Sequence, residues 1–168
     1  CKVFCVQMGK VYRSGYGMHV SNGILYNHES PRRGENFVTQ KIIRGAASIA
    51  QGKTEFLELG NLDIERDWGY APDYVLGMWM MLQQEQSDDY ILATGQTHKL
   101  SDFLQLSFEY FGLDHRKHIR INPKFVRPNE PVHLYGDSSK AQNILGWKPS
   151  VSFEQIIKSM CEATEKSN

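Results

Sequence analysis

Apolar residues recur at helical spacing in some stretches of the chain and alternate with polar residues in others. The helical spacing predicts four longer helices, over residues 2–13, 37–50, 73–84 and 100–111. The shorter apolar or alternating runs predict strands over residues 19–26, 55–59 and 89–94, with further candidates over residues 117–121 and 132–135. Because strands and helices follow one another in turn, the pattern predicts an α/β fold.

Three local features add detail to this pattern. The helix over residues 73–84 is rich in Leu, Met and Trp, so we expect it to be buried on most sides. Residues 60–67 (GNLDIERD) are expected to form a charged turn segment. Ser152 precedes Gln155 by three positions, which is the capping-box pattern and predicts a last helix that begins directly after Ser152.

The first residues of the chain form an unusual helix start. Position 1 is Cys rather than Met, and the helical pattern over residues 2–13 has no capping residue ahead of it. A helix without its first turn leaves N–H groups without partners. We therefore expect the chain to be a fragment of a longer protein.

Composition excludes several classes of protein. The 168 residues contain 19 basic and 19 acidic side chains, so nothing favours binding to nucleic acid or to an anionic membrane. Hydrophobic residues make up 40%, enough for a packed core, and no apolar run approaches the roughly 20 residues of a membrane helix. The N-terminus also lacks a signal-peptide pattern. We expect a cytoplasmic protein.

The polar loop over residues 27–34 (NHESPRRG) is the strongest local indication of a site. It follows a predicted strand, and the carboxyl ends of strands in open α/β sheets face ligands. Arg32 and Arg33 offer planar donor groups for phosphate or carboxylate, and His28 can donate or accept a hydrogen bond. The alternative is a solvated surface loop.

A second set of cations comes from three separate segments. Lys41, Arg66 and Arg127 each lie near an aromatic or turn residue. If they converge, they would neutralise a pyrophosphate through charge-assisted hydrogen bonds, with an aromatic ring free to stack on a base. Spacing alone cannot distinguish this arrangement from scattered surface charge.

Other chemistries have little support in the sequence. The three cysteines form no CxxC pair, and the closest histidines, His115 and His118, lie in a basic run without a second ligand cluster, so no metal site is predicted. The GxSxG elbow of hydrolases is absent, as are the glycine-rich phosphate motifs GxGxxG and GxxxxGK[ST]. Any dinucleotide site formed by these residues would be incomplete.

Five segments together closely resemble the GDP-mannose 4,6-dehydratase family: SNGILYNHESPRRGENFVTQKI (21–42), LGNLDIERDWGYAPDYV (59–75), MMLQQE (80–85), ILATG (91–95) and LGWKPS (145–150). The resemblance extends through nearly the whole chain. The NHESPRRG loop is more specific than the RDW and GWKP elements, which other nucleotide-sugar enzymes share. The segment over residues 112–128 looks shorter than in many members of the family.

The resemblance implies the fold and its division. The family belongs to the extended short-chain dehydrogenase/reductases, so the chain would be the C-terminal part of an NAD(P)-binding Rossmann fold plus a smaller α/β substrate-binding lobe. Residues 1–36 and 71–96 would form the last Rossmann elements. Residues 37–70 and 97–168 would form the sugar-nucleotide lobe.

The resemblance also implies a reaction and the residues that serve it. GDP-mannose would become GDP-4-dehydro-6-deoxy-mannose by hydride transfer from C4 to NADP⁺, loss of water across C5 and C6, and return of the hydride to C6. Lys2 falls on the lysine of the family's YxxxK motif, whose tyrosine would lie before Cys1. It would bind the nicotinamide ribose and lower the pKa of that tyrosine.

Further positions match ligand contacts of the family. His28 and Arg33 would contact NADP, and Arg32 would contact NADP or a neighbouring subunit. The positions implied to face the GDP moiety are Asn27, Val38, Lys41, Leu59, Gly60, Arg66 and Arg127.

The complete enzyme would be a dimer or tetramer, and the 168-residue chain alone would be inactive. The alternatives are a non-catalytic sugar-nucleotide-binding fragment and another nucleotide-sugar epimerase or dehydratase.

Overall fold

The computed structural model describes residues 1–126 and 131–166, so Arg127 lies outside the described residues. Its helices are α1 (Lys2–Tyr16), α2 (Val38–Ala50), α3 (Ala71–Leu82), α4 (Leu100–Tyr110), α5 (Ser139–Leu145) and α6 (Phe153–Lys166). Its strands are β1 (Asn22–Leu25), β2 (Asn27–Glu29), β3 (Leu57–Leu59), β4 (Glu65–Arg66), β5 (Trp68–Tyr70), β6 (Asp89–Leu92), β7 (His98–Lys99), β8 (Ile119–Ile121) and β9 (His133–Leu134). Two 3-10 turns cover His115–Lys117 and Pro123–Phe125.

Short, mostly parallel strand pairs connect segments that are far apart in the sequence. Strand β1 pairs in parallel with β6, β2 with β5, and β3 with β8. Strand β4 lies between β7, to which it is antiparallel, and β9, to which it is parallel. This combination of parallel pairs and intervening helices confirms the predicted α/β class.

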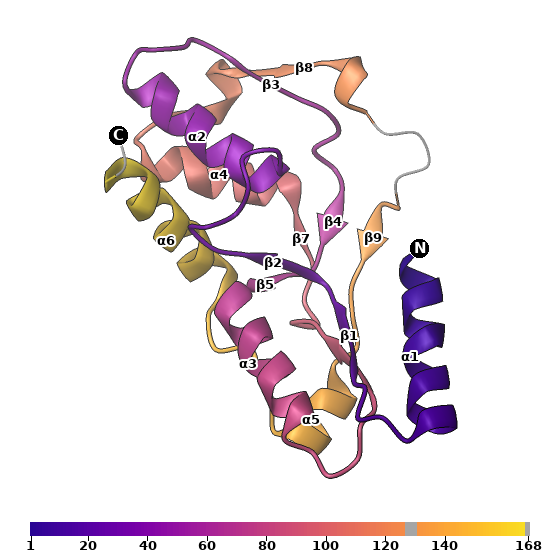
Figure 1. Ribbon diagram of the computed structural model, residues 1–168. Coiled ribbons are helices and arrows are strands. Elements are labelled where there is room, and N and C mark those ends of the chain that lie inside the picture. Colours follow the sequence, from indigo (N-terminus) through magenta and orange to yellow (C-terminus); the bar gives the residue numbers. More distant parts are fainter. Residues whose placement is uncertain (127–130, 167–168) are drawn as a thin grey trace.

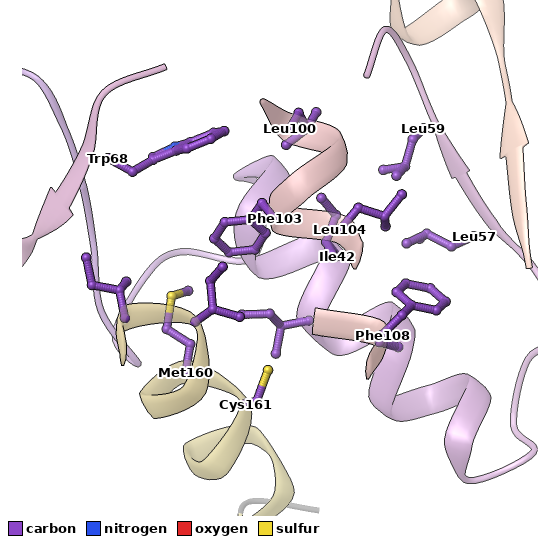
Figure 2. Close-up of a cluster of buried hydrophobic side chains, with 14 of the residues drawn as sticks. Ile42, Leu57, Leu59, Trp68, Leu100, Phe103, Leu104, Phe108, Met160 and Cys161 are labelled. Atoms are coloured by element: carbon purple, nitrogen blue, oxygen red, sulfur yellow. The ribbon is translucent and has the colours of Figure 1, made fainter. Parts of the chain in front are cut away.

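The buried hydrophobic side chains form two clusters. Helices α2, α4 and α6 pack against one another at one end of the molecule, and α3 and α5 lie at the other end with strands running between (Figure 1). The first cluster fills the space among α2, α4 and α6 and includes Phe103, Phe108 and Met160, all 0% exposed (Figure 2). The second joins α3, β6 and α5 around Tyr74 and Trp147.

Two buried aspartates join loops to these clusters. Asp67, which is 0% exposed, accepts hydrogen bonds from Thr94 N and Oγ1 and from the backbone N atoms of Gly95 and Gly136, at 2.7–3.3 Å. Asp73, at the start of α3, accepts hydrogen bonds from Ser150 N at 2.8 Å and Ser150 Oγ at 2.7 Å. The first network anchors the segments that follow β6 and β9 beside β5.

Most predicted helices agree with the structure within a few residues, and the capping box before α6 is confirmed. Ser152 N donates to Gln155 Oε1 at 2.9 Å, and Gln155 N donates to Ser152 Oγ at 3.3 Å. The expectation of a turn over residues 60–67 is wrong in part, because Glu65 and Arg66 form β4. This strand depends on hydrogen bonding to β7 and β9, which lie far along the chain.

The expectation that helix α3 is buried on most sides is wrong. Asp73, Gly77 and Met81, spaced by four, are buried together with Tyr74, so a single face of the helix packs against α5, β5 and β6. The opposite face is apolar but exposed, with Val75, Leu76, Met78, Trp79 and Leu82 between 39% and 62% accessible. Apolar composition therefore indicated a helix here but not which of its sides packs.

Helix α1 stands beside β1 and is attached by polar contacts (Figure 1). Arg13 pairs with Asp89 of β6, and Lys10 lies 3.4 Å from the same carboxylate. Gly9 is the buried residue of the helix, because the Asn22 side chain packs directly against it. Among the described residues, no helix is long and apolar enough to cross a membrane.

Candidate functional site

A cavity of about 540 Å³ lies where β2, the start of α2, the segment after β3 and the strands β4 and β5 come together. The 3-10 turn Pro123–Phe125 closes another side of it. Its described lining residues are Asn27, Glu29, Arg33, Asn36, Phe37, Val38, Thr39, Lys41, Leu59, Gly60, Asn61, Ile64, Arg66, Trp68, Leu100, Lys124 and Phe125. A cavity of this size accommodates a drug-sized organic ligand.

Strand geometry decides which residues of the NHESPRRG loop reach the cavity. Successive side chains of a strand point to opposite sides, so Asn27 and Glu29 share one side of β2 and both line the cavity. His28 points the other way, and its ring lies 5.1 Å from that of Tyr74. Its Nδ1 is 2.8 Å from the Tyr26 carbonyl oxygen, so Nδ1 donates this hydrogen bond, and no described residue is hydrogen-bonded to Nε2.

The described walls of the cavity carry four cations and one carboxyl group, so the cavity favours an anionic ligand. The four cations are Arg33, Lys41, Arg66 and Lys124, and the carboxyl group is that of Glu29.

Arg66 and Lys41 hold the cavity walls in place through backbone carbonyls. Arg66, 8% exposed, donates through Nη1 to the carbonyl oxygens of Glu65 and Pro131 at 2.7 and 2.8 Å. Lys41 Nζ donates to the Glu58 carbonyl oxygen at 2.7 Å and lies 4.1 Å from the Phe125 ring centroid. The Lys41 contacts hold the end of β3 and the turn that carries Phe125 at the cavity, and the Arg66 contacts hold β4 to the segment before β9.

A fully buried carboxyl group lies in the wall beside these cations. Glu29 is 0% exposed, and its Oε2 accepts a hydrogen bond from Thr39 Oγ1 at 2.7 Å. Arg33 Nε is 3.3 Å from the same oxygen, and the Arg33 guanidinium carbon lies 3.5 Å from the Phe37 ring centroid. Burial raises the pKa of Glu29 to about 7, although the Thr39 hydrogen bond and the Arg33 charge act in the opposite direction.

The start of α2 adds further hydrogen-bond donors to the cavity. Phe37, Val38 and Thr39 at this end all line it, and no side chain caps the helix. The first N–H groups of an α-helix have no intrahelical acceptor and carry the positive end of the helix dipole. Together with Lys41 one turn further, they form an arrangement suited to a phosphate group.

The structure brings together most of the residues that the sequence predicted as ligand contacts. The cavity is lined by seven of them, namely Asn27, Arg33, Val38, Lys41, Leu59, Gly60 and Arg66. It is not lined by Lys2, His28 or Arg32; Lys2 is exposed on α1 and Arg32 is exposed in the turn after β2. Lys41 and Arg66, whose convergence spacing could not predict, meet at one cavity.

Several lining residues were not predicted from the sequence. Glu29 could have been found from Asn27, because residues two apart on a strand share a side. Phe37 and Thr39 could have been found from Val38, because they are its neighbours at the start of the predicted helix over residues 37–50. No sequence signal placed Lys124 and Phe125, because their approach to Gly60 depends on the pairing of β3 with β8.

A second, smaller cavity of about 360 Å³ is also lined by Trp68 and lies near the start of α6. Its walls include Phe153, whose ring is stacked on His98 at 3.9 Å between centroids. Among the described residues, no group of three or more His, Cys, Asp or Glu side chains is placed to hold a metal ion.

The chain shares its fold with solved nucleotide-sugar epimerases and dehydratases. The chain is similar to a structure of RMD from Pseudomonas aeruginosa complexed with NADPH, with a TM-score of 0.84 and 21% identity over 99% of this chain and 53% of that one. It is also similar to dTDP-glucose 4,6-dehydratase from Bacillus anthracis in complex with NAD, with a TM-score of 0.81 and 17% identity over 95% and 49% of the two chains. These similarities confirm the predicted fold.

The chain belongs to the GDP-mannose 4,6 dehydratase family, whose model matches residues 1–160. GDP-mannose 4,6 dehydratase 1 of Arabidopsis thaliana is 52% identical over 151 residues, which cover 90% of this chain and 42% of that protein. The human GDP-mannose 4,6 dehydratase is 41% identical over 169 residues, covering 90% and 45%. The predicted family is confirmed, and the chain spans less than half the length of these relatives.

Proposed function

We propose that this chain supplies the sugar-nucleotide-binding part of a GDP-mannose 4,6-dehydratase. The observation that carries the proposal is the convergence of Arg33, Lys41, Arg66 and Lys124 on one cavity. The complete enzyme would convert GDP-mannose to GDP-4-dehydro-6-deoxy-mannose with NADP, a reaction that serves the synthesis of GDP-fucose and other GDP-deoxyhexoses.

The chemistry of the cavity supports a nucleoside diphosphate as the ligand. A diphosphate is acidic at neutral pH and accepts charge-assisted hydrogen bonds, which guanidinium and ammonium groups provide. The start of α2 supplies backbone donors on the same wall. Val38 and Phe125, both half-exposed or nearly so and both lining the cavity, offer apolar surface for a base.

The nicotinamide cofactor would be held only in part by residues of this sequence. A bound nicotinamide supplies a hydride acceptor for C4 of the sugar and the hydride donor for C6. Lys2 presents an exposed cation, and the Nε2 atom of His28 remains available beside β2, so both fit polar groups of such a cofactor. Arg33 faces the sugar-nucleotide cavity in this structure and would bridge the two ligands.

We further propose that the 168-residue chain binds sugar nucleotide but does not convert it. The family's glycine-rich cofactor loop and its YxxxK tyrosine do not occur in this sequence, and without them neither a cofactor cradle nor an acid/base group is present. The complete enzyme would be a cytoplasmic homo-oligomer in which residues 1–36 and 71–96 belong to the Rossmann part. Turnover of GDP-mannose by the purified chain with NADP would contradict this proposal.

Calorimetric binding of GDP-mannose, UDP-glucose and dTDP-glucose to this chain tests the ligand. We expect GDP-mannose to bind and the other two to bind at least about tenfold more weakly. Lys41→Met should weaken GDP-mannose binding about tenfold through the loss of a cation at the cavity, whereas the exposed control Lys53→Met should not change it. Preference for a UDP or dTDP sugar would instead favour another nucleotide-sugar enzyme.

A further inference from the structure

The carboxyl group of Glu29 is only partly satisfied by the protein. Its Oε2 contacts Thr39 Oγ1 at 2.7 Å and Arg33 Nε at 3.3 Å. Its Oε1 is buried and has no hydrogen-bond partner among the described residues. A buried oxygen without a donor is destabilising, and such atoms are rare in native proteins unless water or a ligand completes them.

The position of Glu29 in the cavity wall indicates that a ligand completes the hydrogen bonding of its carboxyl group. Glu29 lies on the same side of β2 as Asn27, and both line the cavity, whose other charged lining residues among those described are cations. Oε2 is already held by Thr39 at the start of α2, which fixes the carboxyl plane. Oε1 is therefore the atom of this cavity-lining group that has no described protein partner.

The chemistry of the Glu29 carboxyl group indicates which part of a sugar nucleotide it could bind. A carboxylate repels phosphate oxygens and accepts hydrogen bonds, and a protonated carboxyl group can also donate one. Arg33, Lys41, Arg66 and Lys124 are suited to the diphosphate, whereas Glu29 is suited to a neutral hydroxyl group. A GDP-hexose carries neutral hydroxyl groups on both sides of the diphosphate, on the ribose and in greater number on the hexose.

We propose that Glu29 is a specificity-determining residue that binds a hydroxyl group of the hexose through Oε1 while Thr39 and Arg33 hold Oε2. The inference rests on the proposed function, because it assigns the hexose end of the same ligand. A site that binds a substrate hydroxyl with a buried polar group rejects analogues without that hydroxyl, because its own polar atom is then left unpaired.

Comparing the affinities of this chain for GDP-mannose and for GDP distinguishes recognition of the hexose from recognition of the nucleoside diphosphate. Glu29→Met removes both carboxyl oxygens at similar side-chain length, and we expect GDP-mannose to bind about 5- to 30-fold more weakly while GDP binding is not weakened. Glu29→Gln keeps hydrogen-bonding atoms at both positions and should recover affinity for GDP-mannose to within about fivefold of the parent chain. Far-UV circular dichroism and cooperative unfolding verify that each variant is folded.

A series of GDP-mannose analogues that each lack one hexose hydroxyl provides a test that needs no substitution. We expect one analogue to bind the unsubstituted chain at least about fivefold more weakly than GDP-mannose, and the same analogue to lose no more than about twofold in Glu29→Met, as a double-mutant cycle requires of directly bonded groups.

Three outcomes contradict the inference in distinguishable ways. If all analogues bind the unsubstituted chain as tightly as GDP-mannose, no hexose hydroxyl is recognised and the inference is wrong. If Glu29→Met weakens GDP and GDP-mannose by the same factor, Glu29 acts only by positioning Arg33, and the inference is wrong while the proposed function stands. If the unsubstituted chain binds neither ligand, the proposed function itself is wrong.

Discussion

The hydrogen bonds of Asp67 lead to a prediction of how much one buried carboxylate stabilises the chain. Oδ1 accepts from Thr94 N at 2.8 Å and from Thr94 Oγ1 at 2.7 Å, and Oδ2 accepts from Gly95 N at 2.8 Å and Gly136 N at 3.3 Å. Both oxygens are needed, because each faces two donors. Asparagine has only one such oxygen, so Asp67→Asn places an amide N–H₂ opposite at least one backbone N–H.

The magnitude follows from the number of donors left without a partner. An unsatisfied buried N–H costs about 1–3 kcal/mol, so Asp67→Asn should lower the free energy of unfolding by about 2 kcal/mol. Asp67→Ala leaves three backbone N–H groups unpaired and should lower it by about 3–5 kcal/mol. The larger loss would result from detachment of the segments after β6 and β9 from β5.

Urea unfolding followed by tryptophan fluorescence measures both values, because Trp68 is adjacent and 2% exposed. Asp63→Asn is the matched control, since Asp63 is an exposed aspartate four residues earlier in the same segment. We expect this control to change stability by less than about 0.5 kcal/mol. If Asp67→Asn unfolds at the same urea concentration as the control, the Asp67 contacts do not hold these segments together and the reasoning fails.

Three further predictions concern groups at or near the two clusters. Because burial raises the pKa of Glu29 from 4.5 to about 7, the native chain keeps a proton that the unfolded chain has lost between these pH values, so stability falls as pH rises through this window, by up to about 3 kcal/mol. Glu29→Gln should remove that part of the pH dependence, measured as the difference between the free energies of unfolding in urea at pH 5 and pH 8. If this difference is the same in the variant as in the unsubstituted chain, the prediction is wrong. Gly60→Ala places a methyl group 2.5 Å from the Phe125 carbonyl oxygen, so the turn must move; we expect a loss of about 1–3 kcal/mol and several-fold weaker GDP binding, measured by urea unfolding and calorimetry. Burial raises the pKa of Cys161 to about 12, so native alkylation at pH 8 followed by mass spectrometry should label the two exposed cysteines and spare Cys161, which should react only after unfolding.

Local sequence patterns predicted the helices well because their signals lie within a dozen residues. The spacing of Val38, Ile42, Ala46 and Ile49 corresponds to the helix observed, although Val38 itself faces the cavity rather than the core. Strand β4 escaped prediction because it is two residues long and depends on distant partners. Local periodicity contains no information about such partners.

For the candidate site, too, the residues near one another in the sequence could be predicted, and those placed by distant strand pairing could not. The NHESPRRG loop was recognised from composition, but composition treats Asn27 and His28 alike, whereas the alternation of β2 sends them to opposite sides. Alternation would also have added Glu29 to the predicted set. The approach of Phe125 to Gly60 could not be predicted, because it follows from pairing between segments about 60 residues apart.

The net charge of the chain and the charges at the cavity act over different distances. With 19 basic and 19 acidic side chains, the molecule has no net field to attract a long polyanion such as nucleic acid. The field inside a cavity depends on the charges within a few ångströms, where low-dielectric walls screen them less than water does. There, the described lining residues include four cations and one carboxyl group, that of Glu29, whose pKa burial raises to about 7. A zero net charge therefore excludes long-range steering of a polymer and leaves room for a local site that binds one small anion.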